Sequence, residues 1–105
     1  MQMPYGVVHR NEIEQAVQEA EHAFKPAGVR YVHYEIAKDW SGDWAVFFRI
    51  LLSDSATRGK RFEQITERVR QMLRERLPEQ VFGLMHYWSF RSESEAAELQ
   101  DAAWK

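Results

Sequence analysis

The run WAVFFRILLS, residues 44–53, constrains the fold more than any other part of the chain because it is apolar on both sides. Successive side chains of an extended strand point to opposite faces of its sheet. The even-numbered positions from Val46 to Leu52 therefore form one apolar face, while Phe47 and Leu51 lie on the other. The sequence predicts a strand with helices packed on one face and a further cover on the second.

A second strand precedes this run and pairs with it. The segment VRYVHYEIAK, residues 29–38, alternates with a period of two. Its apolar face carries Val32, Tyr34 and Ile36, and its other face carries Tyr31, His33 and Glu35. The polar segment DWSGD between the two runs contains a glycine that can adopt a positive φ, as tight turns require. The pattern predicts a β-hairpin.

Two amphipathic helices flank the hairpin. The first begins after Asn11 and extends for about 15 residues until Pro26 ends it. The second covers residues 55–77 and ends before Pro78. Both carry an apolar stripe at the 3.6-residue period. The stripe residues are Ile13, Ala16, Val17, Ala20 and Phe24 in the first helix and Phe62, Ile65, Val69, Met72, Leu73 and Leu77 in the second.

The order of elements sets the fold class. Residues 81–90 form a third extended run, and Ser92 begins a short terminal helix. The order α-β-β-α-β-α predicts a two-layer α+β fold, in which a three-stranded sheet has the two main helices on one face. A length of 105 residues suits one domain, 1–105. Residues 1–8 and the last few residues are predicted to be mobile.

The composition restricts the chemistry and the location. The chain has no cysteine, which excludes disulfides and thiolate metal sites. Charged residues interrupt every apolar run, so none reaches the roughly 20 residues of a membrane span. The first residues also lack the apolar stretch of a secretory signal. We expect a cytoplasmic protein with no membrane partner and no cofactor.

The second sheet face is the main candidate for a functional surface. If the helices cover the face of Val32 and Val46, alternation turns five side chains the other way. These candidate interface residues are Tyr31, His33, Phe47, Arg49 and Leu51. A contiguous apolar face of this kind favours self-association, with a homodimer as the simplest form, or a small protein partner.

Nucleic acid is a second, less favoured class of partner. Residues 55–77 are rich in arginine, and Arg70 and Arg74 point roughly outward on the helical wheel. A basic stripe of this length can contact phosphates. Glutamates at positions 63, 67 and 75 are interleaved with the arginines, so no face carries a single sign of charge. The pattern favours a solvated, salt-bridged helix over a nucleic-acid site.

A metal site is the third hypothesis. His33 and Glu35 share one strand face, and His86 on the third strand can complete a two-histidine, one-carboxylate set if the register allows. The sequence contains no HExxH or HxxxH pair, no GxSxG serine and no glycine-rich phosphate loop. A metal-dependent enzyme centred on these three residues is therefore kept only as an alternative.

The segment GDWAVFFRILLSD, followed by a basic helix and then by SFRSESE, resembles a family of uncharacterised bacterial proteins of about this length. The family pattern reads approximately GDPAIFFRVVLSD with a later FNFRSxSE, and the resemblance spans residues 29–95. This chain departs from the pattern at Trp44 and at Trp88-Ser89. Genes of the family often neighbour genes for HEPN-domain proteins, an α-helical class that includes ribonuclease toxins. The resemblance therefore implies a HEPN-type partner in a toxin–antitoxin-like pair.

The same pattern carries two arginines whose roles we expect to be structural. Arg49 lies among apolar neighbours in mid-strand, and Arg91 leads into acidic residues. We expect these arginines to pair with Glu35, Glu93 or Glu95. The chain lacks the GS-and-carboxylate signature of the nucleotidyltransferases that usually partner HEPN toxins, and the family supplies no catalytic residues. The hypothesis drawn from the sequence is a non-enzymatic protein-interaction or regulatory module.

Overall fold

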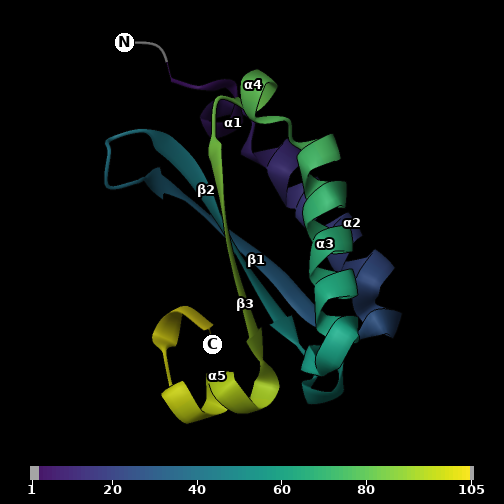
Figure 1. Cartoon of the computed structure of the whole chain (residues 1–105). Coiled ribbons are helices and arrows are strands. Elements are labelled where there is room, and N and C mark those ends of the chain that lie inside the picture. Colours follow the sequence, from purple (N-terminus) through teal and green to yellow (C-terminus); the bar gives the residue numbers. More distant parts are fainter. Residues whose placement is uncertain (1–2, 105) are drawn as a thin grey trace.

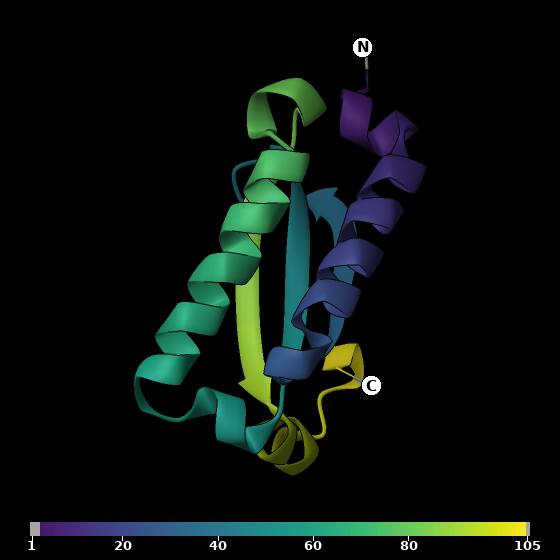
Figure 2. The same ribbon diagram turned by 90° about the vertical axis from the view of Figure 1, so that its right-hand side faces the viewer.

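Two layers, a three-stranded sheet and a pair of long helices, form the structure (Figure 1). The computed structural model describes residues 3–104. The strands are β1 (Val29–Lys38), β2 (Trp44–Leu52) and β3 (Met85–Ser92), with β2 in the middle. The helices α2 (Arg10–Phe24) and α3 (Gly59–Arg76) lie over the same face of the sheet (Figure 2). The predicted α+β class, with both main helices on one face, is confirmed.

The register assigns every strand residue to a face. β1 pairs with β2 antiparallel, so that Tyr34 lies opposite Phe48, and β3 pairs with β2 in parallel, so that Phe48 lies opposite Trp88. This row points toward the helices. The next row, Glu35, Phe47 and Tyr87, points away from them because side chains alternate along each strand. A parallel β2–β3 pair needs a crossover connection, and α3 supplies it.

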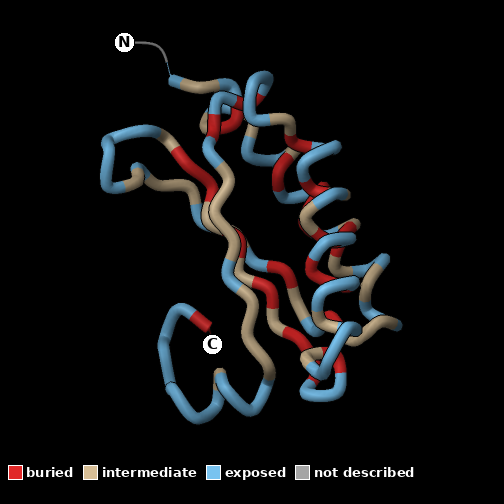
Figure 3. The backbone as a smooth tube through the Cα atoms, in the orientation of Figure 1, coloured by how far each residue is buried: buried red, intermediate tan, exposed pale blue. Residues whose placement is uncertain are grey.

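The core lies between the sheet and the two helices, where the buried segments of the chain face one another (Figure 3). Phe48, Ile50 and Leu52 of the central strand are fully buried. They meet the apolar stripe of α3, of which Val69 and Leu73 are fully buried. The 3.6-residue periodicity therefore predicted which helical side chains reach the core.

Polar contacts fix the connections at the end of the sheet where β2 and β3 finish. Ser53 caps the short 3₁₀ helix η2 (Asp54–Thr57) by accepting a hydrogen bond from the N–H of Ala56. The carboxylate of Asp54 accepts from the backbone N–H of Ser94 at 3.0 Å and also from the Ser94 hydroxyl. These bonds tie η2 to the start of α5 (Glu93–Leu99), and they hold the pKa of Asp54 below its usual value. Gly28 adopts φ 113° beside Ser53, where a Cβ would lie 2.7 Å from the Ser53 hydroxyl.

Both edges of the sheet are partly blocked by carboxylates. On the β1 edge, the N–H of Val32 donates to Glu21 of α2 at 2.9 Å. On the β3 edge, the N–H of His86 donates to Glu79 at 3.1 Å. Each bond satisfies a backbone donor that would otherwise offer itself to another strand, which disfavours edge-to-edge aggregation.

The structure differs from the sequence prediction at the start of the third strand. Residues 79–82 form the short helix α4 (Glu79–Phe82) instead of the start of the strand, because Pro78 caps the turn and Gly83 closes it with φ 68°. At the start of the described chain, α1 (Tyr5–Val8) buries Gly6 against Leu84. At the other end, Trp104 of the 3₁₀ helix η3 (Ala102–Trp104) is buried. Gly6 and Trp104 are the buried residues of these two segments. Residues 1, 2 and 105 lie outside the described chain, and the mobility expected for residues 1–8 and the last few residues stays a prediction.

Across residues 3–104, none of the helices combines the length and apolar character needed to cross a membrane.

A matched pair of substitutions tests the face assignment. Phe48→Ala removes a fully buried ring from the core and is expected to lower the free energy of unfolding by about 3–5 kcal/mol. Phe47→Ala removes the same atoms from the opposite, half-buried face, with an expected loss of about 1 kcal/mol. Urea denaturation followed by circular dichroism measures both. Equal losses would show that both faces belong to one core.

Candidate interaction surface

The sheet face that α2 and α3 leave uncovered is the candidate site, and we call it the open face. It consists of four rows, each with one residue from β1, β2 and β3 in turn. The rows are Ala37-Ala45-Met85, Glu35-Phe47-Tyr87, His33-Arg49-Ser89 and Tyr31-Leu51-Arg91. The β1–β2 turn lies beyond the first row, and the C-terminal segment lies against the last row on the side away from α3 (Figure 1).

Three aromatic rings, which we call the hairpin cluster, lie at the turn end of the open face. Phe47 and Tyr87 stack with ring centroids 5.1 Å apart and planes 19° apart. Trp40, in the turn, lies 5.2 Å from Tyr87. Trp40 is 83% exposed, more than any other large apolar residue of the described chain. A large aromatic held against a sheet and open to solvent is typical of a binding surface rather than of a core.

The carboxylate of Asp39 fixes the turn that carries Trp40. It accepts hydrogen bonds from the Tyr87 hydroxyl at 2.8 Å, from the Ser41 hydroxyl at 2.7 Å and from the backbone N–H of Ser41 and of Asp43. The Ser41 hydroxyl is the main cause, with Tyr87 second, that lowers the pKa of Asp39 from 3.8 to about 2. The hydrogen bond that the Tyr87 hydroxyl donates to Asp39 is also the main cause that raises the pKa of Tyr87. These four hydrogen bonds hold the turn, and with it the backbone of Trp40, in a fixed position.

Charged and polar side chains form the middle of the open face. Arg49 and Glu35 form an ion pair at 2.8 Å, and only 24% of the arginine side chain is exposed. His33, beside Arg49, stacks on Tyr31 with ring centroids 3.7 Å apart. The predicted pairing of Arg49 with Glu35 is confirmed, and that of Arg91 with Glu95 is found at 3.7 Å. These pairs place fixed charges beside the aromatic rings.

The last row of the open face is covered by the chain itself. Trp104 is only 6% exposed. The Tyr31 hydroxyl donates to the Trp104 carbonyl oxygen at 2.7 Å, and the Arg91 guanidinium lies 4.7 Å from the centre of the indole ring. Burial is the main cause that raises the pKa of Tyr31, partly opposed by the positive charges of Arg49 and Arg91.

All five predicted interface residues lie on the open face, but they do not form one free surface. Tyr31 is in contact with Trp104, whereas Phe47 belongs to the hairpin cluster. Tyr87 and Trp40 were not among the predicted interface residues. Tyr87 was missed because the phase of β3 could not be set without knowing where the strand begins, and Trp40 because it lies in the turn, outside the alternation of the strands. Pro78 and Gly83, which bound α4, were the available signal.

The arginines proposed for nucleic-acid contact are engaged in packing on β3. The guanidinium of Arg70 lies 5.1 Å from the ring centre of Phe90, and that of Arg74 lies 5.9 Å from Trp88. Both arginines also approach Glu67, at 3.6 and 4.0 Å. Cation–π and ionic contacts of this kind account for both residues without a phosphate.

The three candidate metal ligands do not come together. His33 and Glu35 lie on the open face, whereas His86 pairs with Val46 and lies on the helix face. Burial lowers the pKa of His86, and its ring packs edge-on against Phe48 and Trp88. In the part of the chain that the structure describes, no three histidine or carboxylate side chains are grouped to hold a metal ion. The sheet register therefore corrects the predicted set.

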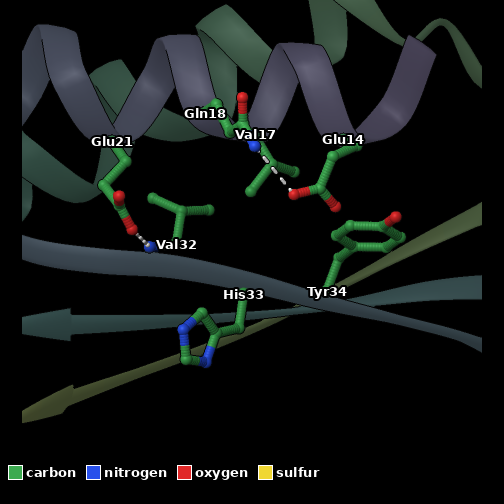
Figure 4. Close-up of a pocket in the computed structure, with 7 residues that line it drawn as sticks. All are labelled: Glu14, Val17, Gln18, Glu21, Val32, His33 and Tyr34. Atoms are coloured by element: carbon green, nitrogen blue, oxygen red, sulfur yellow. Dashed lines mark hydrogen bonds between the residues drawn. The ribbon is translucent and has the colours of Figure 1, made fainter. Parts of the chain in front are cut away.

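A pocket of about 330 Å³ lies between α2 and β1 (Figure 4). Its carboxylates serve the fold, since Glu21 binds the N–H of Val32 and Glu14 accepts from Gln18 at 3.0 Å. Tyr34 points toward the helix and His33 to the other side of the strand (Figure 4). Both acidic groups of the pocket are thus hydrogen-bonded within the chain.

Comparisons with family models, with curated proteins and with solved structures found no match to this chain. Two residues of the segments that carry the resemblance make structural contacts: Arg49 pairs with Glu35, and the Asp54 carboxylate accepts a hydrogen bond from the N–H of Ser94 at the start of α5.

The Asp39 network predicts a specific pH dependence. The pKa of Asp39 is lower in the folded chain than its ordinary 3.8, so its contribution to stability is complete above about pH 4 and is lost as the pH falls through about 2. Tyr87→Phe removes one donor and should move the carboxyl titration midpoint part of the way back toward 3.8. Ser41→Ala should move it as well, because Ser41 is the larger cause. Carbon-detected NMR titration measures the midpoint, and an unchanged value in both variants would contradict the network.

Proposed function

We propose that this chain is a non-enzymatic protein-interaction module that binds a segment of another protein across its open face. One observation carries the proposal: Trp40 is 83% exposed and packs on Tyr87, which stacks on Phe47, on the sheet face that α2 and α3 leave uncovered. Aromatic residues with few rotatable bonds supply much of the binding energy at protein interfaces. The Asp39 network holds the turn in place, so little conformational entropy is lost when a partner packs on Trp40.

The size of the face favours a partner segment over a second copy. Three strands at about 4.8 Å spacing and seven residues at about 3.3 Å rise cover about 300 Å². Trp40 adds about 200 Å². The sum is well below the roughly 800 Å² that each partner buries in a standard stable interface. A helix or an extended segment needs less area when aromatic anchors dominate, so it fits this surface better than a face-to-face homodimer does.

The charges near the hairpin cluster favour a protein over a nucleic acid. The carboxylates of Asp39, Asp43 and Glu79 lie close enough to the Tyr87 hydroxyl to raise its pKa. Phosphate groups approaching the aromatic rings would meet this negative potential. The exposed aromatics are therefore poorly suited to stacking on bases, and they are well suited to apolar side chains from a protein segment that also carries positive charge.

The resemblance supplies a candidate partner for this surface. A HEPN-type protein is α-helical, and an amphipathic helix is one of the two segment types that fit the open face. Under this proposal the chain would act as the regulatory member of a toxin–antitoxin-like pair, acting by binding rather than by catalysis.

Substitutions on and off the open face test the proposal. Phe47→Glu places a carboxylate beneath the partner and should weaken partner binding at least thirtyfold, and Trp40→Ala should weaken it about tenfold or more. Gln71→Glu adds the same charge to an exposed position of α3 and serves as the control. The variants and the wild type are used as baits for lysate of the source cells. Proteins held by the wild type and the control but lost by both open-face variants are then purified and measured by calorimetry.

Light scattering at tens of micromolar gives an independent readout. The wild type is expected to be monomeric. A dimer that Phe47→Glu dissociates would replace the partner segment with a second copy, and a purified partner bound equally by Phe47→Glu would place the interface elsewhere.

A further inference from the structure

The seat of Trp104 on the open face, formed by Tyr31 and Arg91, has the contacts of a peptide-recognition site. It provides a hydrogen-bond donor for a backbone carbonyl, because the Tyr31 hydroxyl donates to the Trp104 oxygen at 2.7 Å. It provides a cation for an aromatic ring, because the Arg91 guanidinium lies 4.7 Å from the indole centre. Arg91 also lies 3.5 Å from the Asp101 carboxylate. One arginine thus contacts both an aromatic residue and the acidic residue three positions before it.

Residues 101–104, which fill the seat, are held to the rest of the chain mainly by these contacts with Tyr31 and Arg91. None of the residues in the preceding helix α5 is buried, and Leu99 is 56% exposed. Gln100 ends that helix with a positive φ of 51°, after which Asp101 accepts from the N–H of Ala103 and turns the chain back to the sheet. Trp104 is not part of the core cluster between the sheet and the helices. The segment can therefore leave the sheet without opening the core.

We propose that the Tyr31–Arg91 seat recognises a short protein segment with an aromatic residue and an acidic residue three positions before it, and that residues 101–104 occupy it while no partner is bound. This inference rests on the proposed function and extends it. The seat is the last row of the same open face whose second row belongs to the hairpin cluster. A partner segment lying along the strands would reach both, and it would displace Trp104 as it binds.

The tethering of residues 101–104 sets how strongly a partner has to bind. A short tether gives its ligand an effective concentration of about 1 mM. A partner at about 1 μM that used the seat alone would be excluded about a thousandfold by mass action. A partner that also packs on Trp40 and Phe47 can recover this factor, because aromatic anchors are worth tenfold to a thousandfold each. Trp104 would thus select for partners that use both ends of the open face.

The test supplies the segment in trans. The probe is a synthetic peptide, ELQDAAW, labelled with fluorescein at its N-terminus and amidated at its C-terminus so that it copies residues 98–104 without an added carboxylate, and its binding is followed by fluorescence anisotropy. The full chain with Trp104→Ala, in which the seat is empty, should bind the peptide with a dissociation constant below about 0.1 mM, a tenth of the effective concentration of the tethered segment. The wild-type chain should bind at least tenfold more weakly, because its own segment competes.

Two control peptides distinguish specific recognition from nonspecific binding. ELQDAAA lacks the aromatic residue and should lose binding to the Trp104→Ala chain. ELQKAAW reverses the charge that meets Arg91 and should bind several-fold more weakly. Equal binding of all three peptides, or no binding of ELQDAAW to a folded Trp104→Ala chain, would overturn the proposal.

A second variant keeps the test decisive if Trp104→Ala fails to fold. Asp101→Lys retains the indole but removes both the ion pair with Arg91 and the hydrogen bond from the N–H of Ala103, so it weakens the tethered occupant without changing Tyr31 or Arg91. Its binding of ELQDAAW should exceed that of the wild type several-fold, and no increase would count against the seat. Because these peptides do not reach the hairpin cluster, the seat can fail while Phe47→Glu still abolishes partner binding, and the reverse outcome is equally distinguishable.

Discussion

The two-sided apolar character of β2 is the constraint on which the rest of the structure depends. Phe48, Ile50 and Leu52 must be buried on one side, and α2 and α3 together bury them. Phe47 and Leu51 then face away from both helices. After α3 the described residues form α4, β3, α5 and η3. β3 widens the open face instead of covering it, and η3 reaches only its last row. The partly covered face is therefore a consequence of the order of the elements along the described chain.

The parallel pairing of β3 explains why the aromatic residues concentrate on this sheet. An antiparallel third strand could follow a tight turn, but a parallel one requires α3 to return the chain to its starting end. β3 thus lies at an edge, where its rings meet β2 on both faces: Trp88 stacks on Phe48 toward the helices, and Tyr87 stacks on Phe47 toward solvent. The stacking of Trp88 on Phe48 extends the core. The stacking of Tyr87 on Phe47 lies on the open face, which α2 and α3 do not cover.

Much of the fold could be predicted from the sequence, and the residues show where prediction stopped. Alternation correctly assigned the faces of β1 and β2, because Val32, Phe48 and Ile50 repeat at a clear period of two. It could not assign the faces of β3, because Val81 and Phe82 look like strand residues but belong to α4, so the start of the strand was misplaced. The grouping of His33 and Glu35 with His86 failed for the same reason, since a shift in phase moves a side chain to the other face. The contact between Tyr31 and Trp104 joins residues that are 73 positions apart, so no local sequence pattern could have predicted it.

The two ends of the open face are held in different ways, and this difference matters for how a partner could use them. At the turn, Asp39 accepts four hydrogen bonds from neighbouring groups, so Trp40 is presented without any change in the fold. At the other end, Tyr31 and Arg91 are occupied by a segment joined to the sheet by one buried residue and an exposed ion pair. A partner would therefore meet the hairpin cluster first, as a ready surface, and gain the second end only by displacing Trp104. Binding energy from the exposed rings would then be used to open a site that the free chain keeps closed.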